Sequence, residues 1–426
     1  MAYIPKERKS LLASGARLQA PWIKITLGTY TFGVFGERDK KKDSSGMYTN
    51  YNVQYPSYVK SLNIIKINGQ VNQYSLTLEY PVRSHDDPNL IEKILSSVTR
   101  TRKIVFSYGD ATNPAYVYKD EEAIITKVTQ QFNMESSVIQ YEISAVSACA
   151  LASSGSFTFT NTSPKKPSDE IKRILRDNTY GLKALFRGVN DNNINQLIDG
   201  TDQAVQLDTK TNISPLEYIN YLVGCMIPAG ASADARTKDL YILTLHDETI
   251  FDTSFSNSNI SYGGPYLKVT RVSTNTMYMS DAYEIDVGIN TSTIVLGFSI
   301  ENNENYAMLY DYNEALVTEQ YNMRLNDQGK WEQTFAPMFT SGNNQYLTRP
   351  EDRSWFTKLT KYPISATIKV QGLLRPASLL QFVRLIVFFP GGNYHISSGL
   401  YLVTKQVDNI SSSGYVTTLS MTRLSD

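Results

Sequence analysis

The chain has 426 residues, more than one hydrophobic core normally holds, so we expect two or three domains. Its 41 basic and 41 acidic side chains give a formal net charge of zero, which argues against a broad surface for nucleic acid or anionic membrane. Cys149 and Cys225 lack metal-ligand spacing, and no apolar run reaches signal-peptide or transmembrane length, so we expect two buried thiols in a soluble protein made in a cytoplasm.

The first part of the chain is predicted to be an arm followed by a β domain. Residues 1–20 carry basic side chains without sustained periodicity and form the expected N-terminal arm. Asn68-Gly69 predicts a tight hairpin turn, and Asp87-Pro88 predicts the N-cap and first position of a helix. Strand-like alternation recurs through the first β domain, residues 21–155, in the runs 23–35, 61–71, 73–82, 103–110, 121–132 and 138–148.

Residues 156–264 read as a smaller, mixed α/β middle domain. A linker rich in Ser, Thr and Pro leads to a helix that we expect Ser168 to cap, and a second helix should end at Gly200. Ser214-Pro215-Leu216-Glu217 is a capping box that opens a third helix. An apolar run at 238–247 predicts a strand, so the domain is not all helical.

A second β domain is predicted for residues 265–426. Strands return after Gly263-Gly264-Pro265, and turn residues separate them as in a barrel or sandwich. The clearest runs are 267–275, 282–289, 293–300, 364–372, 385–389, 399–407 and 415–424.

The two β domains resemble each other at their ends. Ile125-Thr126-Lys127 matches Val403-Thr404-Lys405, and a constant offset then places Tyr141 on Leu419, Ile143 on Met421 and Ser144 on Thr422. Upstream, the run 103–106 matches 385–388 if the first copy has a loop four residues longer. Two unrelated amphipathic hairpins could look alike, but the shared order of strand, glycine turn, strand and hairpin favours a duplicated barrel on both sides of the middle domain.

The sequence predicts no motif for catalysis, cofactor binding or metal binding. The phosphate-loop and nucleophile-elbow patterns are absent, and Gly33-Val34-Phe35-Gly36 lacks the third glycine of a dinucleotide site. The closest constellation is His246-Asp247-Glu248, which we interpret as polar residues ending a strand. The other two histidines, His85 and His395, have no spaced ligand set.

Paired carboxylates leave one enzymatic alternative open, since glycoside hydrolysis needs only two suitably spaced acids. Asp86-Asp87 is explained by the helix cap, and Glu121-Glu122 is expected to be solvated before a strand. Glu351-Asp352 is a third pair, and Lys40-Lys41-Lys42 is interpreted as a solvated loop tip. A carbohydrate-binding protein would be marked by exposed aromatic platforms, but Trp22, Trp331 and Trp355 do not cluster in the sequence.

The motifs of the second half resemble the hub family of contractile phage tails and related injection machines, which includes late control proteins and the base of VgrG spikes. The resemblance lies in the strand Gly399-Leu400-Tyr401-Leu402-Val403, the following Gly414-Tyr415-Val416-Thr417-Thr418-Leu419 ending at Arg423, and the capping box at Ser214. It covers roughly residues 20–426, although each motif is degenerate. The chain ends at Asp426, where spike proteins continue into a needle, so we expect that role to belong to a separate protein.

The resemblance implies a non-enzymatic, structural protein of the virion, assembled in the host cytoplasm. It implies a homotrimer that joins the hexameric tail tube to a spike or tail-tip protein, contacts other baseplate proteins, and lets DNA pass without sequence-specific binding or membrane insertion. We expect the hairpin of residues 403–405 and 415–424 to pair with neighbouring subunits, because its edges must be covered. The alternatives are a receptor- or carbohydrate-binding tail protein and a cell-envelope glycoside hydrolase.

Overall fold

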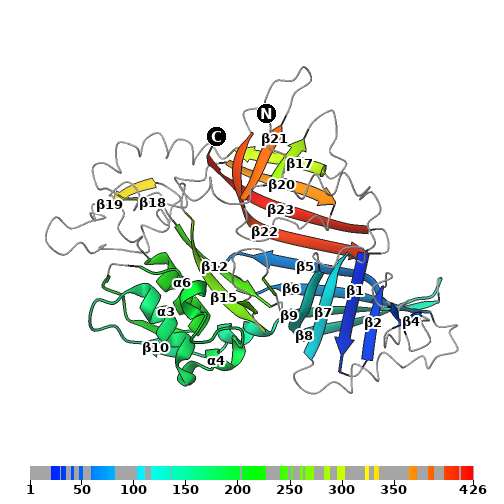
Figure 1. Ribbon diagram of the computed structural model, residues 1–426, viewed down its shortest axis with the longest axis horizontal. Coiled ribbons are helices and arrows are strands. Elements are labelled where there is room, and N and C mark those ends of the chain that lie inside the picture. The colour runs from blue at the N-terminus through cyan, green and yellow to red at the C-terminus, as the bar shows by residue number, and fades with distance from the viewer. Residues whose placement is uncertain are drawn as a thin grey trace.

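A computed structural model shows a mainly β chain with few helices, as the sequence predicts (Figure 1). No helix in its described part is long and apolar enough to cross a membrane. The arm 1–20 and the helix expected at Asp87-Pro88 lie outside the described residues. The structure describes residues 21–28, 30–34, 40–42, 48–50, 59–81, 103–110, 117–135, 137–201, 204–226, 240–247, 251–252, 260–261, 264–272, 283–287, 295–302, 322–325, 331–334, 364–371, 382–387, 398–411 and 414–425.

Seven strands form what we call the first β unit, in the spatial order β5-β6-β9-β8-β7-β1-β2. β2 and β5, at the two ends of this order, come into contact, so the sheet curls around one apolar core. The lysine run expected as a loop tip is strand β3 (Lys40–Lys42), paired with β4 (Tyr48–Asn50). The seven strands are β1 (Pro21–Leu27), β2 (Tyr30–Val34), β5 (Val59–Ile67), β6 (Gln73–Pro81), β7 (Lys103–Asp110), β8 (Val117–Asn133) and β9 (Val138–Ser147).

Six strands form the second β unit, in the order β16-β21-β22-β23-β20-β17. Its end strands, β16 and β17, also come into contact around a separate core. The connection from β17 to β20 contains a small hairpin of β18 (Asn322–Leu325) and β19 (Trp331–Thr334). The six strands are β16 (Tyr283–Val287), β17 (Val295–Asn302), β20 (Ile364–Gln371), β21 (Phe382–Val387), β22 (Gly399–Ser411) and β23 (Gly414–Ser425).

The two β units share one strand order. Taken in chain order, β1, β5, β6, β7, β8 and β9 occupy the same relative positions as β16, β17, β20, β21, β22 and β23. Register shifts also fall at the same places, at Lys60 and Leu296 in β5 and β17 and at Thr126 and Thr404 in β8 and β22. One pairing differs, because β1 runs antiparallel to β7 whereas β16 runs parallel to β21.

The two threonines at the bulges, Thr126 and Thr404, make the same hydrogen bond in both β units. Thr126 Oγ1 donates a hydrogen bond to the Ser144 carbonyl at 3.2 Å, and Thr404 Oγ1 donates one to the Ser420 carbonyl at 3.1 Å. A bulge leaves one residue unpaired and re-aims the strand, so its recurrence at the same position indicates one architecture used twice.

The pairing corrects part of the sequence alignment of the two halves. Ile125–Lys127 does match Val403–Lys405, but Ser144 corresponds to Ser420 instead of Thr422, and Tyr141 to Thr417 instead of Leu419. The reason is turn length, because four residues separate β8 from β9 and only two separate β22 from β23. Upstream, Lys103 corresponds to Phe382 instead of Leu385, since these residues pair with Ile124 and Leu402.

Between the β units in chain order, and beside them in space, lies a middle unit whose helices pack with a strand pair around the third core (Figure 1). Its helices are η4 (Ala148–Ser153), α3 (Pro167–Arg176), η5 (Asn178–Tyr180), α4 (Leu182–Leu185), α5 (Ile194–Leu197) and α6 (Pro215–Gly224). Its strand pairs are β10 (Phe157–Phe159) with β11 (Lys210–Ile213), β12 (Leu240–His246) with β15 (Tyr266–Val272), and β13 (Phe251–Asp252) with β14 (Ile260–Ser261).

In the middle unit, one local prediction from the sequence is confirmed and others are corrected. The capping box at Ser214 and Glu217 is confirmed, with both reciprocal hydrogen bonds present. Ser168 does not cap α3, because the helix begins at Pro167 and the Ser168 hydroxyl contacts Thr201. The helix expected to stop at Gly200 ends earlier, at Leu197. β15 pairs with β12 and not with the second β unit, so the middle core extends past the predicted boundary at residue 264.

The Asn68-Gly69 turn generates a stability prediction. Gly69 has φ of +69°, and a Cβ there would lie 3.0 Å from Asn220 Oδ1, whereas Gly28 has φ of +58° with nothing within 4 Å of its Cβ position. Both Gly→Ala substitutions should cost about 1 kcal/mol from left-handed strain. Gly69→Ala should lower the urea midpoint of unfolding further, because it also pushes on Asn220. Equal losses in the two variants would contradict the tight docking of this turn.

Candidate assembly site at the junction of the three units

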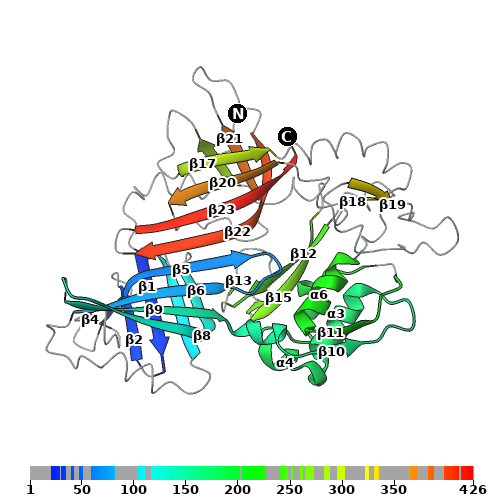
Figure 2. The ribbon, with the colours of Figure 1, turned by 180° about the vertical axis from the view of Figure 1, so that it is seen from behind.

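Strand β22 joins the two β units. It pairs with β21 as far as Leu402, and after the bulge at Thr404 it pairs antiparallel with β5, Lys405–Ser411 against Ser61–Ile67 (Figure 2). The predicted use of this hairpin edge for contacts between subunits is therefore wrong for β22. The chain's own β5 already covers that edge.

The tip of this hairpin contributes to the other unit's core. Ile410 and Tyr415, from β22 and β23, are 0% and 1% exposed and belong to the apolar cluster of the first β unit. They lie with Leu62 and Ile64 of β5, both also 0% exposed. Burial of one such side chain is worth about 1.5–3 kcal/mol, so the joint is a shared core as well as a ladder of backbone hydrogen bonds.

The Asn68-Gly69 turn at the end of β5 brings in the middle unit. The Asn68 N–H donates to the Thr404 carbonyl at 3.2 Å, and the Gly69 N–H donates to the Leu243 carbonyl of β12 at 2.9 Å. The Gly69 carbonyl in turn accepts from Asn220 Nδ2 of α6 at 3.2 Å. This single turn therefore contacts both other units through directional hydrogen bonds.

A buried polar network lies beside this turn. Lys66 and Glu121, 6% and 0% exposed, form an ion pair at 2.5 Å. Glu121 also accepts hydrogen bonds from the hydroxyls of Tyr74 at 2.8 Å and Tyr108 at 2.9 Å. A buried carboxylate requires partners of this kind, because desolvation of an unpaired charge costs several kcal/mol.

The network extends to the middle unit through Asp247, which directly follows β12 and is 0% exposed. Its carboxylate accepts from Asn72 Nδ2 at 2.5 Å and from the Ser147 hydroxyl, and the Tyr74 hydroxyl lies 3.2 Å away. Asn72 and Ser147 belong to the first β unit. Asp247 therefore fixes the middle unit to the first β unit.

On the side of the second β unit, the buried acid is Asp408. It accepts hydrogen bonds from Gln406 Nε2 at 2.5 Å and Thr417 Oγ1 at 2.6 Å. Burial raises its pKa above the usual range, while the Thr417 hydrogen bond and the nearby positive charge of Lys66 act in the opposite direction. Lys66, whose backbone faces Gln406 across the ladder, is thus between the acids of two units.

These acids are buried and held by hydrogen bonds or an ion pair. Glu121, Asp247 and Asp408 are all 0% exposed, so a soluble substrate does not reach them. The prediction that the Glu121-Glu122 pair is solvated is wrong for Glu121, which lies inside β8 and points into the core. Glu122 is partly exposed and pairs with Lys103 at 2.7 Å and Arg187 at 2.6 Å.

Of the remaining candidates from the sequence, His246 and the two cysteines lie in the part of the chain that the structure describes. His246 stacks on Tyr266 with ring centroids 4.6 Å apart and lies 2.9 Å from the Thr244 hydroxyl. Both cysteines are buried in the middle core, as predicted. No group of three or more His, Cys, Asp or Glu in the described part of the chain could hold a metal ion. Outside the described residues lie His85, Asp86, Asp87, Glu248, Glu351, Asp352, Trp355 and His395.

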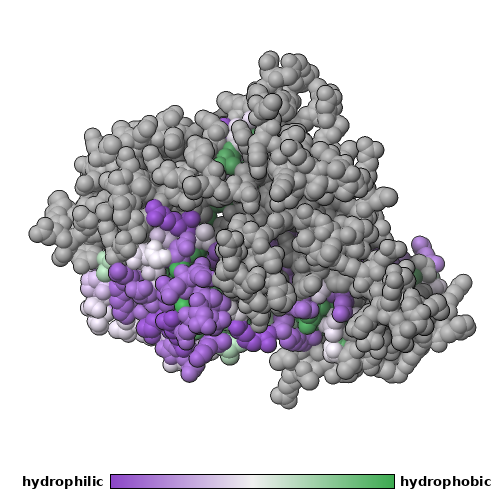
Figure 3. Space-filling view, viewed as in Figure 1, coloured by the Kyte–Doolittle hydropathy of each residue, from purple (hydrophilic) through white to green (hydrophobic). Residues whose placement is uncertain are grey.

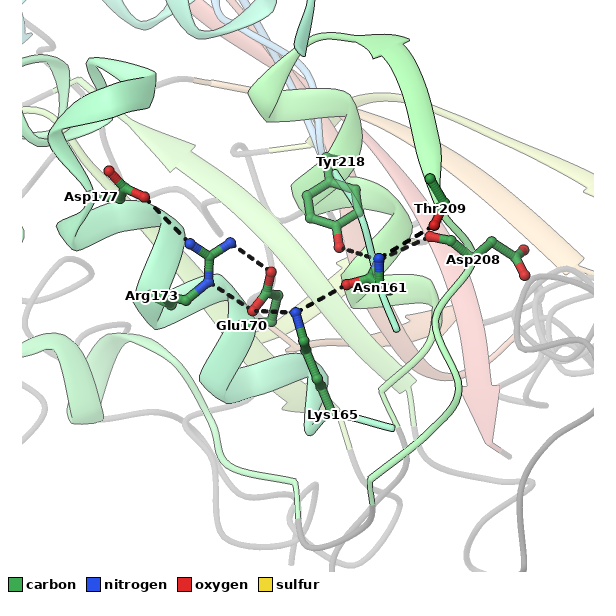
Figure 4. Close-up of polar contacts among 8 residues, drawn as sticks. All are labelled: Asn161, Lys165, Glu170, Arg173, Asp177, Asp208, Thr209 and Tyr218. Atoms are coloured by element: carbon green, nitrogen blue, oxygen red, sulfur yellow. Dashed lines mark hydrogen bonds and ion pairs between the residues drawn. The ribbon is translucent and has the colours of Figure 1, made fainter. Parts of the chain in front are cut away.

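The middle unit has its own buried acid, Glu170 of α3 (Figure 4). Arg173 holds its two carboxylate oxygens at 2.7 and 2.9 Å, and Lys165 Nζ lies 3.7 Å away. Lys165 also donates to Asn161, whose amide donates to the Tyr218 hydroxyl of α6 at 2.8 Å. The network ties α3 to α6, and the described surface on the side of the molecule seen in Figure 3 is mostly hydrophilic.

The Lys66–Glu121 pair yields a prediction with a control on the same strand. Lys66→Met should destabilise the protein by about 3 kcal/mol, because it leaves Glu121 buried without its counter-charge. Lys60→Met, which breaks the partly exposed Lys60–Glu79 pair, should cost less than about 1 kcal/mol. Adding Glu121→Gln to Lys66→Met should recover part of the loss while keeping an acceptor for the tyrosines. Urea unfolding followed by tyrosine fluorescence measures all three, and equal effects of Lys66→Met and Lys60→Met would contradict the buried pair.

No protein-family model matches the chain, and no curated protein matches it in sequence. Solved structures similar to it include a tail protein from Neisseria meningitidis, 9% identical with a TM-score of 0.49, covering 95% of this chain and 97% of that one. A 43 kDa tail protein of prophage MuSo2 from Shewanella oneidensis is 10% identical with a TM-score of 0.48, covering 94% and 98%. A type VI secretion component from E. coli, described as similar to the T4 tail proteins gp27 and gp5, is 9% identical with a TM-score of 0.45, covering 88% and 76%.

Proposed function

We propose that this chain is a structural hub of a phage tail or baseplate, in which three copies form a ring that joins the hexameric tail tube to a central spike or tail-tip protein. The ring forms part of the conduit through which DNA leaves, without sequence-specific contact. In this role the protein acts in the virion, beside the tube protein and other baseplate proteins, and it is not an enzyme. Each chain supplies two barrels, the first and second β units.

The observation that carries the proposal is the duplicated strand order within one rigidly joined chain. A sixfold tube and a threefold spike cannot match surface for surface, so their connector has to present both symmetries. Two related β units per chain, each with the same strand order and the same bulges, give a trimer six similar surfaces on one side. Three middle units remain for contacts of threefold symmetry.

The burial of the acids also favours a mechanical role over a cell-envelope glycoside hydrolase. Hydrolysis requires two carboxyl groups that face the glycosidic bond, and in the described residues the buried acids are held by ion pairs and hydrogen bonds instead. A receptor- or carbohydrate-binding tail protein is the second candidate, because the chain is rich in tyrosine, with 29 residues.

Native mass spectrometry of the full chain tests the proposal. We expect three copies per particle, and electron micrographs of that particle should show a ring with six lobes. A matched assay measures release of sugar from bacterial envelope and binding to a glycan array. A chain that stays monomeric at high concentration and binds glycans would replace the hub with the receptor-binding alternative, and envelope cleavage would replace it with the hydrolase.

A further inference from the structure

β8 of the first β unit is the equivalent of β22, the strand that joins the two units. Unlike β22, β8 has no strand paired along the corresponding part of its outer edge in the described residues. Residues 405–411 of β22 pair with β5, and their equivalents by the shared bulge are residues 127–133 of β8. On one side β8 pairs with β9 over this stretch, and β7 pairs with β8 only up to Ile124. Among the described strands, none pairs with the other side of Val128–Phe132.

Equivalent side chains on β22 and β8 differ strongly in their exposure to solvent. Ile410 of β22 is 0% exposed inside the neighbouring core, whereas its equivalent Phe132 is 54% exposed. The described residues contain four exposed large hydrophobic side chains, and two of them, Phe132 and Met134, lie at the tip of the β8–β9 hairpin. An exposed phenylalanine at a position that is buried in the sister copy indicates a surface that a partner covers.

The complementary surface is found on β17, the equivalent of β5. The shared register places Phe298 on Leu62 and Ile300 on Ile64. Leu62 and Ile64 are fully buried under Ile410 and Tyr415, but Phe298 and Ile300 are only partly buried against the second core. Another exposed large hydrophobic, Leu296 at 54%, is the bulge residue of β17. In the described residues β17 pairs only with β20, on its other side.

We propose that β8 of one copy of this chain pairs antiparallel with β17 of the next copy, and that Phe132 enters the second core of that neighbour beside Phe298 and Ile300. The register follows from the joint inside the chain, where Asn409 faces Asn63 and Ile410 faces Leu62. Transferred to the copies, Gln131 faces Ser299 and Phe132 faces Phe298 of the neighbour. This inference rests on the proposed ring and specifies the contact that closes it.

The contact is heterologous, since different edges meet, and repetition of such a contact builds a ring when its rotation closes. It also differs in charge from the joint inside the chain. The buried Asp408 and Gln406 of β22 correspond to Gln130 and Val128 of β8, and Lys66 corresponds to Asn302. None of the three residues at these positions is charged, so no charge would be desolvated there when two copies meet. The free energy gained by apolar burial is therefore not offset by a large desolvation cost.

Disulfide crosslinking tests the register directly. In the full chain, Gln131→Cys combined with Ser299→Cys should give covalent dimers and trimers under mild oxidation, because facing residues on paired strands have the Cα separation that a disulfide needs. The control Asn63→Cys with Asn409→Cys should form its disulfide within one chain and give no covalent oligomer. A second control, Glu142→Cys with Ser299→Cys, places one thiol on the exposed face of β9 and should give no crosslink.

The side-chain contribution is tested with Phe132→Asp against Leu151→Asp, a 49% exposed leucine of η4, an element that is part of neither strand edge. Phe132→Asp should weaken association at least tenfold, measured by sedimentation, while the circular dichroism spectrum and the unfolding midpoint stay those of the parent. Leu151→Asp should leave the trimer intact. A trimer that survives Phe132→Asp and does not crosslink through 131 and 299 overturns the β8–β17 contact but leaves the hub standing. A parent chain that is monomeric overturns both.

Discussion

The arrangement of this protein depends on one strand that belongs to two units. β22 begins in the second β unit beside β21 and, past the bulge at Thr404, continues as a neighbour of β5 in the first. Because a ladder of backbone hydrogen bonds fixes both separation and register, the two units cannot rotate independently about this joint. The buried Ile410 and Tyr415 at the hairpin tip add apolar burial to the same contact. The pair of β units therefore behaves as a single rigid piece.

The polar network beside the joint fixes the orientation of the middle unit against the first β unit, which apolar packing alone would not determine. Hydrophobic contact is non-directional, whereas Asp247 and Glu121 each accept hydrogen bonds that require one arrangement of their donors. A buried ion pair adds little net stability compared with apolar residues of the same shape, but a half-broken one is costly. The hydrogen bonds of Asp247 to Asn72, Ser147 and Tyr74 thus penalise any other orientation of the middle unit against the first β unit, while the Lys66–Glu121 pair and its tyrosines fix the interior of the first β unit.

Much of the local structure was predictable from the sequence. The Asn68-Gly69 turn, the capping box at Ser214 and the alternating strands all have short-range causes, namely positive φ, reciprocal capping and a period of two. The repeat was visible as well, through the Thr-Lys match in β8 and β22. These features need no knowledge of distant contacts, and the structure contains them where they were expected.

The joint was not predictable, for reasons that lie in the bulges. A bulge shifts the inward face by one residue, so Gln406 and Asp408 point inward where unbroken alternation would place Lys405 and Val407. No residue type marks Thr404 as a bulge in advance. Glu121 and Lys66 were missed because their charges suggested exposure, and only their mutual distance explains their burial. The choice of β5 as a partner for β22 likewise depends on comparison among many similar amphipathic strands.

β8 and β22, the two copies of the joint-forming strand, differ as the proposed contact between two chains would require. The joint inside the chain forms during folding, so it can contain the buried Asp408 and its partners, which are never displayed on a finished monomer. The β8 edge, in contrast, meets water before assembly, and an exposed strand edge invites uncontrolled pairing. It presents Phe132, with Met134 in the following turn, next to the polar Thr129, Gln130 and Gln131. In the proposed ring, the polar residues of this edge would oppose uncontrolled pairing before assembly, and Phe132 would be the anchor in the second core of the neighbouring copy.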